Sequence, residues 1–266
     1  MNENTFDTIN ECAKYLDIEK YAGKLPAYAY EHNLTPEAVE VLGKVMEHIR
    51  DTKQASVIET LLNFSRLPKV DLKTFENFDF ERVHGKNVEK LKSLPSLSAV
   101  YSRKNLAFIG PTGLGKTHLA MAFGRACCMN ELKTYFLKAS ELNQRFKDAR
   151  KYGRTGSVIN GLVKPTCLII DEIGHDVFDK ENTRLFFDVI DRRYSKDTPG
   201  CMIFTSNREP NTWSEYFTGD DDLLCSLDRV FDDASVFIFN GESYRGRKCE
   251  TIKLEVGGLH AIGSNY

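Results

Sequence analysis

The chain has 266 residues, enough for one α/β domain with a sizeable core and a smaller helical domain. Its 36 basic and 38 acidic residues give a formal net charge of −2, which excludes a chain-wide attraction to nucleic acid. Any DNA contact would therefore need a local basic patch. We also expect a reduced, cytoplasmic protein without membrane contact, because its seven cysteines form no CxxC motif and it has neither a signal peptide nor a long apolar run.

Residues 1–70 are predicted to be helical. Thr35 suits an N-cap and Pro36 a first helical turn, and the following EAVEVLGKVMEHI spaces its apolar residues at helical intervals. A further helix is predicted over SVIETLLNF, ending near Pro68. Nothing catalytic stands out in this segment, so we expect a small α-helical N-terminal domain.

Residues 71–104 are predicted to connect this domain to a core at 105–248, followed by a tail at 249–266. The connector contains FENFDF, with alternating aromatic and polar residues, and a helix predicted over NVEKLKSL. In the core, apolar runs alternate with amphipathic stretches: NLAFIG, HLAMAFGRACCM, TYFLKA, ELNQRFKDARKY, CLIIDE, TRLFFDVIDRRY and CMIFTSN. This alternation predicts an α/β fold, with a parallel sheet covered by helices on both faces.

A glycine-rich stretch, GPTGLGKT, follows the first predicted strand of the core and opens a helix. It matches the phosphate-loop pattern GxxxxGK[ST] in the strand–loop–helix setting that this pattern requires. Its backbone N–H groups and the helix dipole favour phosphate, Lys116 should reach the β- and γ-phosphates, and Thr117 should bind Mg²⁺. The predicted nucleotide-binding residues are Gly110, Pro111, Thr112, Gly113, Leu114, Gly115, Lys116, Thr117 and His118.

Polar residues end the next two apolar strands. Asp171 and Glu172 close CLIIDE at the carboxyl end of a strand, where ligands bind in such sheets. Asp171 is predicted to hold Mg²⁺, and Glu172 to orient and deprotonate an attacking water, although two solvated acids would also fit this position. CMIFTSN is expected to lie beside CLIIDE, so that Asn207 shares this water and senses the γ-phosphate. Capping of the next turn is the alternative for Asn207.

Two charged stretches remain open to more than one interpretation. NQRFKDARKYGR should be an exposed helix running into a loop, either a DNA contact or a solvated basic face. Its cations are Arg145, Lys147, Arg150, Lys151 and Arg154. In DDDLLCSLDRVFDD, Arg229 is either an ion-pair partner of the surrounding aspartates, such as Asp232, or a residue with a separate function.

Seven segments, GPTGLGKTHLA, CLIIDEIG, RRY, FTSN, NTWSEYF, SLDRV and GESYR, occur in this order within residues 75–248. In this order they resemble the IstB/DnaC family of AAA+ ATPases, and FENFDF and the helical N-terminal region resemble the IstB-type insertion-sequence transposition helpers. The resemblance implies an AAA+ core without a large lid, Mg²⁺-dependent ATP hydrolysis, and a homo-oligomeric ring or helical filament on double-stranded DNA. The partner that it implies is a transposase or, for a DnaC-type loader, a replicative helicase; residues 1–70 would dock this partner or DNA.

The same resemblance assigns roles to single residues. Lys116 and Thr117 correspond to Walker A, Asp171 and Glu172 to Walker B, and Asn207 to sensor 1. Arg229 corresponds to the arginine finger, which reaches the nucleotide of a neighbouring subunit, and Arg245 to sensor 2. After LDR, relatives often carry histidine or other basic or neutral residues, whereas Phe231, Asp232 and Asp233 stand here, which puts a DNA contact from this loop in doubt. A small-molecule P-loop kinase and a non-catalytic nucleotide sensor are the alternative functions. Glu172 and Asn207 argue against the kinase, and the complete pair of Walker motifs argues against the sensor.

Overall fold

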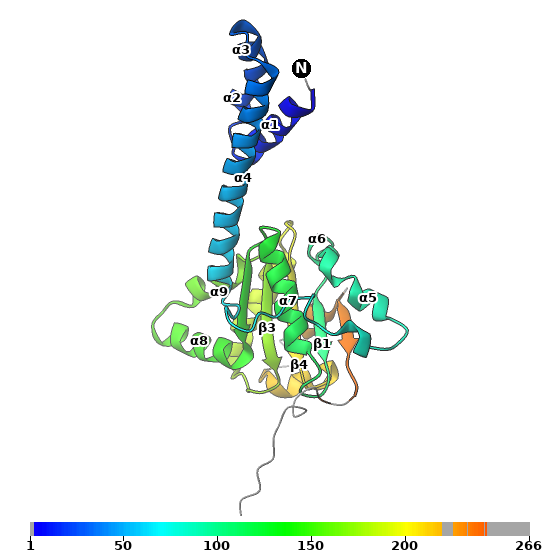
Figure 1. Ribbon diagram of the computed structural model, residues 1–266. Helices are drawn as coiled ribbons and strands as arrows, with labels where there is room; N and C mark the ends of the chain where they lie inside the picture. Colours follow the sequence, from blue (N-terminus) through cyan, green and yellow to red (C-terminus); the bar gives the residue numbers. More distant parts are fainter. Residues whose placement is uncertain (1–2, 220–225, 233, 242, 244–266) are drawn as a thin grey trace, which may run out of the picture.

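Five apolar runs of the sequence form one parallel sheet. They are β1 (Leu106–Ile109), β2 (Thr134–Lys138), β3 (Cys167–Ile173), β4 (Cys201–Ser206) and β5 (Ser235–Ile238), in the order β2-β3-β4-β1-β5. The computed structural model describes residues 3–219, 226–232, 234–241 and 243 (Figure 1). The predicted parallel sheet is confirmed, and β4 pairs with β3 as expected.

The first face of the sheet packs against α7 (Lys116–Met129) and the connector. Successive side chains of a strand point to opposite faces, and both faces are buried here, so the central strands are apolar throughout. Leu106, Phe108, Ile169 and Ile203 contribute to this face. The connector adds α5 (Val88–Lys92), α6 (Ser98–Tyr101) and short 3₁₀ helices at Phe80–Arg82 and Leu94–Ser96. The helix predicted over NVEKLKSL is therefore shorter than expected.

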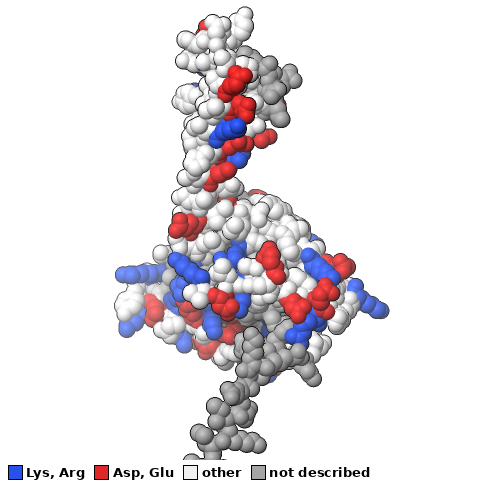
Figure 2. All heavy atoms as spheres, viewed as in Figure 1, with Lys and Arg blue, Asp and Glu red and all other residues white. Residues whose placement is uncertain are grey.

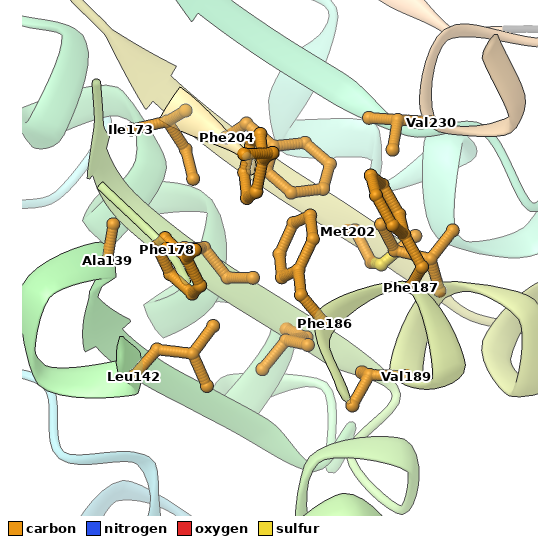
Figure 3. Close-up of a cluster of buried hydrophobic side chains, with 14 of the residues drawn as sticks. Ala139, Leu142, Ile173, Phe178, Phe186, Phe187, Val189, Met202, Phe204 and Val230 are labelled. Atoms are coloured by element: carbon orange, nitrogen blue, oxygen red, sulfur yellow. The ribbon is translucent and has the colours of Figure 1, made fainter. Parts of the chain in front are cut away.

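The second face of the sheet packs against α8 (Ala139–Lys151), α9 (Thr155–Val163), α10 (Lys180–Tyr194) and α12 (Ser226–Phe231). Figure 3 shows Phe186 and Phe187 of α10 in one cluster with Phe204 and Met202 of β4. A further 3₁₀ helix, Pro210–Tyr216, places the buried Trp213 edge-on against Phe204, with ring centroids 5.8 Å apart. This aromatic layer fixes the helices against the strands that end in the polar residues of the site.

The N-terminal part is a helical unit that projects from the core (Figure 1). It consists of α1 (Glu3–Tyr15), α2 (Glu19–Ala22), α3 (Leu25–Glu31) and α4 (Pro36–Ser65). Thr35 caps α4 as predicted, because its hydroxyl accepts a hydrogen bond from the backbone N–H of Ala38 at 3.3 Å. The prediction of two successive helices was wrong, since residues 44–60 contain neither glycine nor proline and α4 runs through them unbroken.

The C-terminal half of α4 joins the helical unit to the core. Glu131, in the turn between α7 and β2, accepts hydrogen bonds from Tyr15 of α1 at 3.0 Å and from Gln54 of α4 at 2.9 Å. Arg66, directly after α4, forms an ion pair with Glu141 of α8. The helical unit is thus attached to the end of the helix that begins at the phosphate loop. None of the described helices combines the length and apolar character needed to cross a membrane.

Candidate nucleotide-binding and catalytic site

The phosphate loop is a backbone cradle between β1 and α7. Gly110 has φ +139° and Gly115 has φ +87°, a region that favours glycine. A Cβ on Gly110 would lie 2.2 Å from the Phe239 carbonyl oxygen, and one on Gly115 would lie 2.7 Å from Phe78 Cε2. Both positions therefore require glycine for space as well as for conformation.

Lys116 is buried at the start of α7, and its Nζ donates to the Pro111 carbonyl oxygen at 2.6 Å. The ammonium group thus folds back across the loop, where it can exchange the carbonyl for a phosphate oxygen. A cradle of N–H groups with a lysine at its centre fits the triphosphate of ATP.

Three oxygen-bearing side chains meet beside the loop, at the carboxyl ends of β3 and β4. Asp171 Oδ1 accepts hydrogen bonds from the hydroxyls of Thr117 at 2.8 Å and Thr205 at 2.5 Å. Burial raises the pKa of the Asp171 carboxyl, while these two hydrogen bonds act in the opposite direction. A carboxylate and a hydroxyl are hard oxygen ligands, so Asp171 and Thr117 fit Mg²⁺, directly or through water.

Glu172 follows Asp171 in an unusual backbone conformation. Its φ is +62°, at a bulge in the pairing of β3 with β4, and its N–H donates to Thr205 Oγ1 at 3.0 Å. Its carboxylate forms an ion pair with Lys138, at 2.9 Å. Lys138 ends β2 and is the register partner of Asp171, which explains how it reaches this carboxylate. Thr205 and Lys138 thus fix the predicted general base, and sequence reasoning identified neither of these supports.

Asn207 lies in the same cleft, just after β4. Its Nδ2 donates to Thr112 Oγ1 of the phosphate loop at 3.0 Å and lies 3.3 Å from His175 Nε2. His175 belongs to a tight turn after β3, in which its N–H donates to the Glu172 carbonyl oxygen at 3.3 Å. The structure therefore brings Asn207 to the phosphate loop and to the turn that carries Glu172. His175 is a further cleft residue that the sequence did not suggest.

Thr112, Lys116, Thr117, Glu172 and Asn207 line one cleft of about 530 Å³. The connector forms its opposite wall, with Asp71, Phe78 and Asp79 among the lining residues. His118 of α7 bonds the Thr74 carbonyl oxygen through Nε2 at 2.8 Å, and its ring meets Phe78 edge-on at 5.3 Å. Burial lowers the pKa of His118. The FENFDF segment, predicted as part of a connector, therefore also builds the cleft.

A second cavity of about 680 Å³ lies on the other side of the phosphate loop. It is lined by residues 82–88, Leu91, Leu114 and residues 236–241. Leu114 of the phosphate loop is thus directed away from the cleft that contains Glu172. Together the two cavities leave space along both sides of the loop.

Arg229 is not among the residues that line this cleft. It belongs to α12, and its Nη1 lies 2.6 Å from Asp191 Oδ1 of α10. Arg229 is thus paired with an acid of another helix, and Asp232, the neighbour named as an alternative partner, instead accepts a hydrogen bond from the Tyr194 hydroxyl at 3.2 Å. Arg245, predicted as sensor 2, lies outside the described residues, as does Asp233.

Comparison with known proteins identifies the family. A family model described as IstB-like ATP binding protein matches residues 13–251. The chain belongs to this family. It is 36% identical to an insertion sequence IS5376 putative ATP-binding protein of Geobacillus stearothermophilus, over 83% of this chain and 85% of that protein. It is 32% identical to an insertion sequence IS232 putative ATP-binding protein of Bacillus thuringiensis subsp. berliner, over 91% of this chain and 96% of that protein.

Solved structures agree with this assignment at the level of the fold. DnaI is similar with a TM-score of 0.54 and 17% identity, over 68% of this chain and 95% of DnaI. AMPPCP-bound DnaA from Aquifex aeolicus is similar with a TM-score of 0.53 and 22% identity, over 66% of this chain and 51% of that one. The fold of this IstB-like chain is thus that of an AAA+ P-loop core preceded by a helical region, as the sequence predicts.

In this member of the IstB-like family, the basic stretch forms most of α8 and the turn after it. The prediction of a helix running into a loop is confirmed, and the loop is short, since α9 begins at Thr155. Figure 2 shows basic side chains over α8, with acidic ones among them. Arg145 folds back to Tyr135 and Glu141, and Arg150 forms two contacts with Asp179, at 2.8 and 3.0 Å. The three remaining cations of the stretch, Lys147, Lys151 and Arg154, are exposed.

Proposed function

We propose that this protein hydrolyses ATP with Mg²⁺ as copies of it assemble on duplex DNA, and that it thereby assists the transposase of an insertion sequence. The observation that carries the proposal is that Thr117 and Glu172 line one cleft beside the phosphate loop, with the buried Asp171 hydrogen-bonded to Thr117. A kinase acting on a small molecule has to keep water from the γ-phosphate. A carboxylate in this cleft is suited to the opposite purpose, activation of water.

In the proposed mechanism, the loop N–H groups and Lys116 bind the phosphates, and Thr117 and Asp171 hold Mg²⁺. The metal would supply charge neutralisation at the β- and γ-phosphates. Glu172 takes a proton from water at its carboxylate, and Asn207 donates a hydrogen bond toward the γ-phosphate or that water. For this, the Glu172 carboxylate must exchange the Lys138 ammonium group for water, because the ion pair occupies the oxygen that would accept the proton.

The proposed partners rest on two different observations. The relatives named above are putative ATP-binding proteins of insertion sequences, which supports a transposase as the protein partner. The exposed Lys147, Lys151 and Arg154 support contact with DNA phosphates, which needs charge but no base sequence. Each subunit offers few such contacts, so repetition of the subunit along one duplex would provide the affinity.

Steady-state ATPase measurements test the proposal. Turnover per subunit should rise with protein concentration and with added duplex DNA, because neighbouring subunits complete each site. A Glu172→Gln variant is the control for contaminating ATPases. Turnover that is constant per subunit and indifferent to DNA would contradict the assembly, and phosphate transfer to a metabolite would support the kinase. Capture of a transposase of an IstB-type insertion sequence, by the full-length protein with an ATP analogue, tests the partner.

A further inference from the structure

An exposed tyrosine stands at the C-terminal end of α8, among the cations proposed to contact DNA. Tyr152 is 61% exposed and occupies the C-cap position of this helix. A tyrosine in such a position can bury a large apolar surface against a partner at a small cost in side-chain entropy.

The backbone that carries Tyr152 is fixed by hydrogen bonds. Gly153 has φ +65°, and its N–H donates to the Arg150 carbonyl oxygen at 3.4 Å. The N–H of Arg154 donates to the carbonyl oxygen of Ala149 at 2.7 Å. These two bonds and the left-handed glycine form a Schellman motif, which ends the helix in a defined conformation. The ring of Tyr152 is therefore exposed on a fixed helix end.

A second set of contacts holds this helix end against the core. Ala149 is buried beneath it, and Arg150 contacts both carboxylate oxygens of Asp179, at 2.8 and 3.0 Å. Asp179 caps α10, where it accepts a hydrogen bond from the Asn182 N–H at 2.8 Å. Arg150 thus ties the turn to α10, and we expect little loss of backbone freedom when this turn binds a partner.

The charges around Tyr152 indicate the chemistry of this partner. Lys151 Nζ lies 5.3 Å from the centre of its ring and the Arg154 guanidinium 6.0 Å, so both cations rest over the aromatic face. Within the described residues, neither cation forms an ion pair with a carboxylate. Both cations can turn toward phosphates, and the aromatic ring is then uncovered. This combination suits a nucleic acid as the partner better than an apolar pocket of a protein.

We propose that Tyr152 stacks on a base of the bound DNA while Lys151 and Arg154 hold the adjacent phosphates. This inference rests on the DNA binding proposed above and adds a base contact to it. In intact duplex DNA the bases are already stacked on one another, so the ring can enter only where a base step opens, at a cost of free energy. The stacking itself is independent of base sequence, because every base has an aromatic face. The α8 turn would thus favour DNA that is already opened or easily kinked.

This proposal predicts a preference that depends on a single side chain. With Mg²⁺ and a non-hydrolysable ATP analogue, the wild-type protein should bind a duplex with a central mismatch more tightly than the intact duplex of equal length. Tyr152→Ala should weaken binding to the mismatched duplex by about 5- to 150-fold, the range measured for loss of one base–aromatic stack. It should also abolish the preference, whereas Tyr152→Phe should retain it. Tyr101→Ala is the matched control, because Tyr101 is 58% exposed and lies on α6.

Fluorescence of 2-aminopurine at the mismatch provides an independent readout. Its emission should change on binding of the wild-type protein and much less with Tyr152→Ala. Lys151→Ala should weaken binding to both duplexes equally and reduce the slope of log K against log salt by about 0.9 for each phosphate that the variant no longer neutralises.

The outcomes separate this proposal from the function on which it rests. If Tyr152→Ala binds both duplexes like the wild type while Lys151→Ala weakens both, base stacking is refuted and the DNA interface stands. If none of the three substitutions Lys147→Ala, Lys151→Ala and Arg154→Ala weakens binding, the proposed DNA interface on α8 is refuted together with the stacking. If the wild-type protein binds neither duplex, the DNA-binding function itself fails.

Discussion

Replacing Thr205 with valine would test whether one buried hydroxyl organises the candidate catalytic site. Thr205 is 1% exposed, donates to Asp171 at 2.5 Å and accepts from the Glu172 N–H at 3.0 Å. Valine has nearly the same shape but removes both hydrogen bonds. A hydrogen bond to a charged group contributes about 1.5–3 kcal/mol, and a buried N–H left unpaired costs about 1–3 kcal/mol. Because the two bonds share one network, we expect the free energy of unfolding to fall by about 2–4 kcal/mol.

The same substitution should lower ATP turnover more than it lowers ATP affinity. The Glu172 backbone would lose a hydrogen bond that stabilises its left-handed conformation. The Asp171 carboxyl, whose pKa burial already raises, would lose a hydrogen bond that opposes this rise. Urea denaturation and steady-state ATPase kinetics measure the two effects. Thr205→Ser should restore both, and Thr183→Val is the control, a buried hydroxyl whose bond goes to a carbonyl at 3.4 Å. Wild-type stability and turnover in Thr205→Val would refute this reasoning.

Three further predictions follow from the structure. Glu172→Gln should bind ATP normally but lower turnover by about 10²–10⁴-fold, measured by nucleotide binding and single-turnover hydrolysis. Arg229→Ala should also retain ATP binding and lose hydrolysis, and mixing it with Lys116→Ala should restore part of the ATPase activity. If Arg229 acts on the nucleotide of its own subunit, the mixture should recover no activity. Asp179→Ala should lower the free energy of unfolding by about 1 kcal/mol, because α10 loses its N-cap. Burial raises the pKa of Asp179, but hydrogen bonds from a backbone N–H and Arg150 lower it further, so that it lies below its usual range. The stability that Asp179 contributes is therefore lost as pH falls below about 4. In urea titrations at different pH, the stability of the variant should depend less on acid than that of the wild type.

The sequence predicted those parts of the molecule in which local pattern and structure coincide. The apolar runs and the helical spacing between them were sufficient for the parallel sheet, and the carboxyl ends of adjacent strands had to bring Asp171 and Asn207 to one edge. The glycines of the phosphate loop were recognisable because loop, strand and helix are consecutive in the chain. Prediction failed for α4, since the apolar spacing was interpreted as two helices although no residue between them ends a helix.

Contacts between distant segments could not be predicted in the same way. Lys138 meets Glu172 because β2 pairs with β3 in one particular register, which no local pattern specifies. Asp191 holds Arg229 because α12 packs on α10, and the six aspartates near Arg229 in sequence gave no indication of this. The role of Phe78 in the cleft depends on the connector folding back over Gly115.

The position of Arg229 argues against a role at the nucleotide of its own subunit. The Asn105 amide, just before β1, donates to the Val230 carbonyl oxygen at 2.9 Å, so α12 lies at the amino end of β1. The phosphate loop begins at the carboxyl end of the same strand, and the first and last residues of β1 lie about 10 Å apart. If Arg229 contacts a γ-phosphate, we therefore infer that the phosphate belongs to a neighbouring copy. The exposed ion pair with Asp191 would not prevent this, because water and salt weaken such pairs and a triphosphate offers more negative charge than one carboxylate.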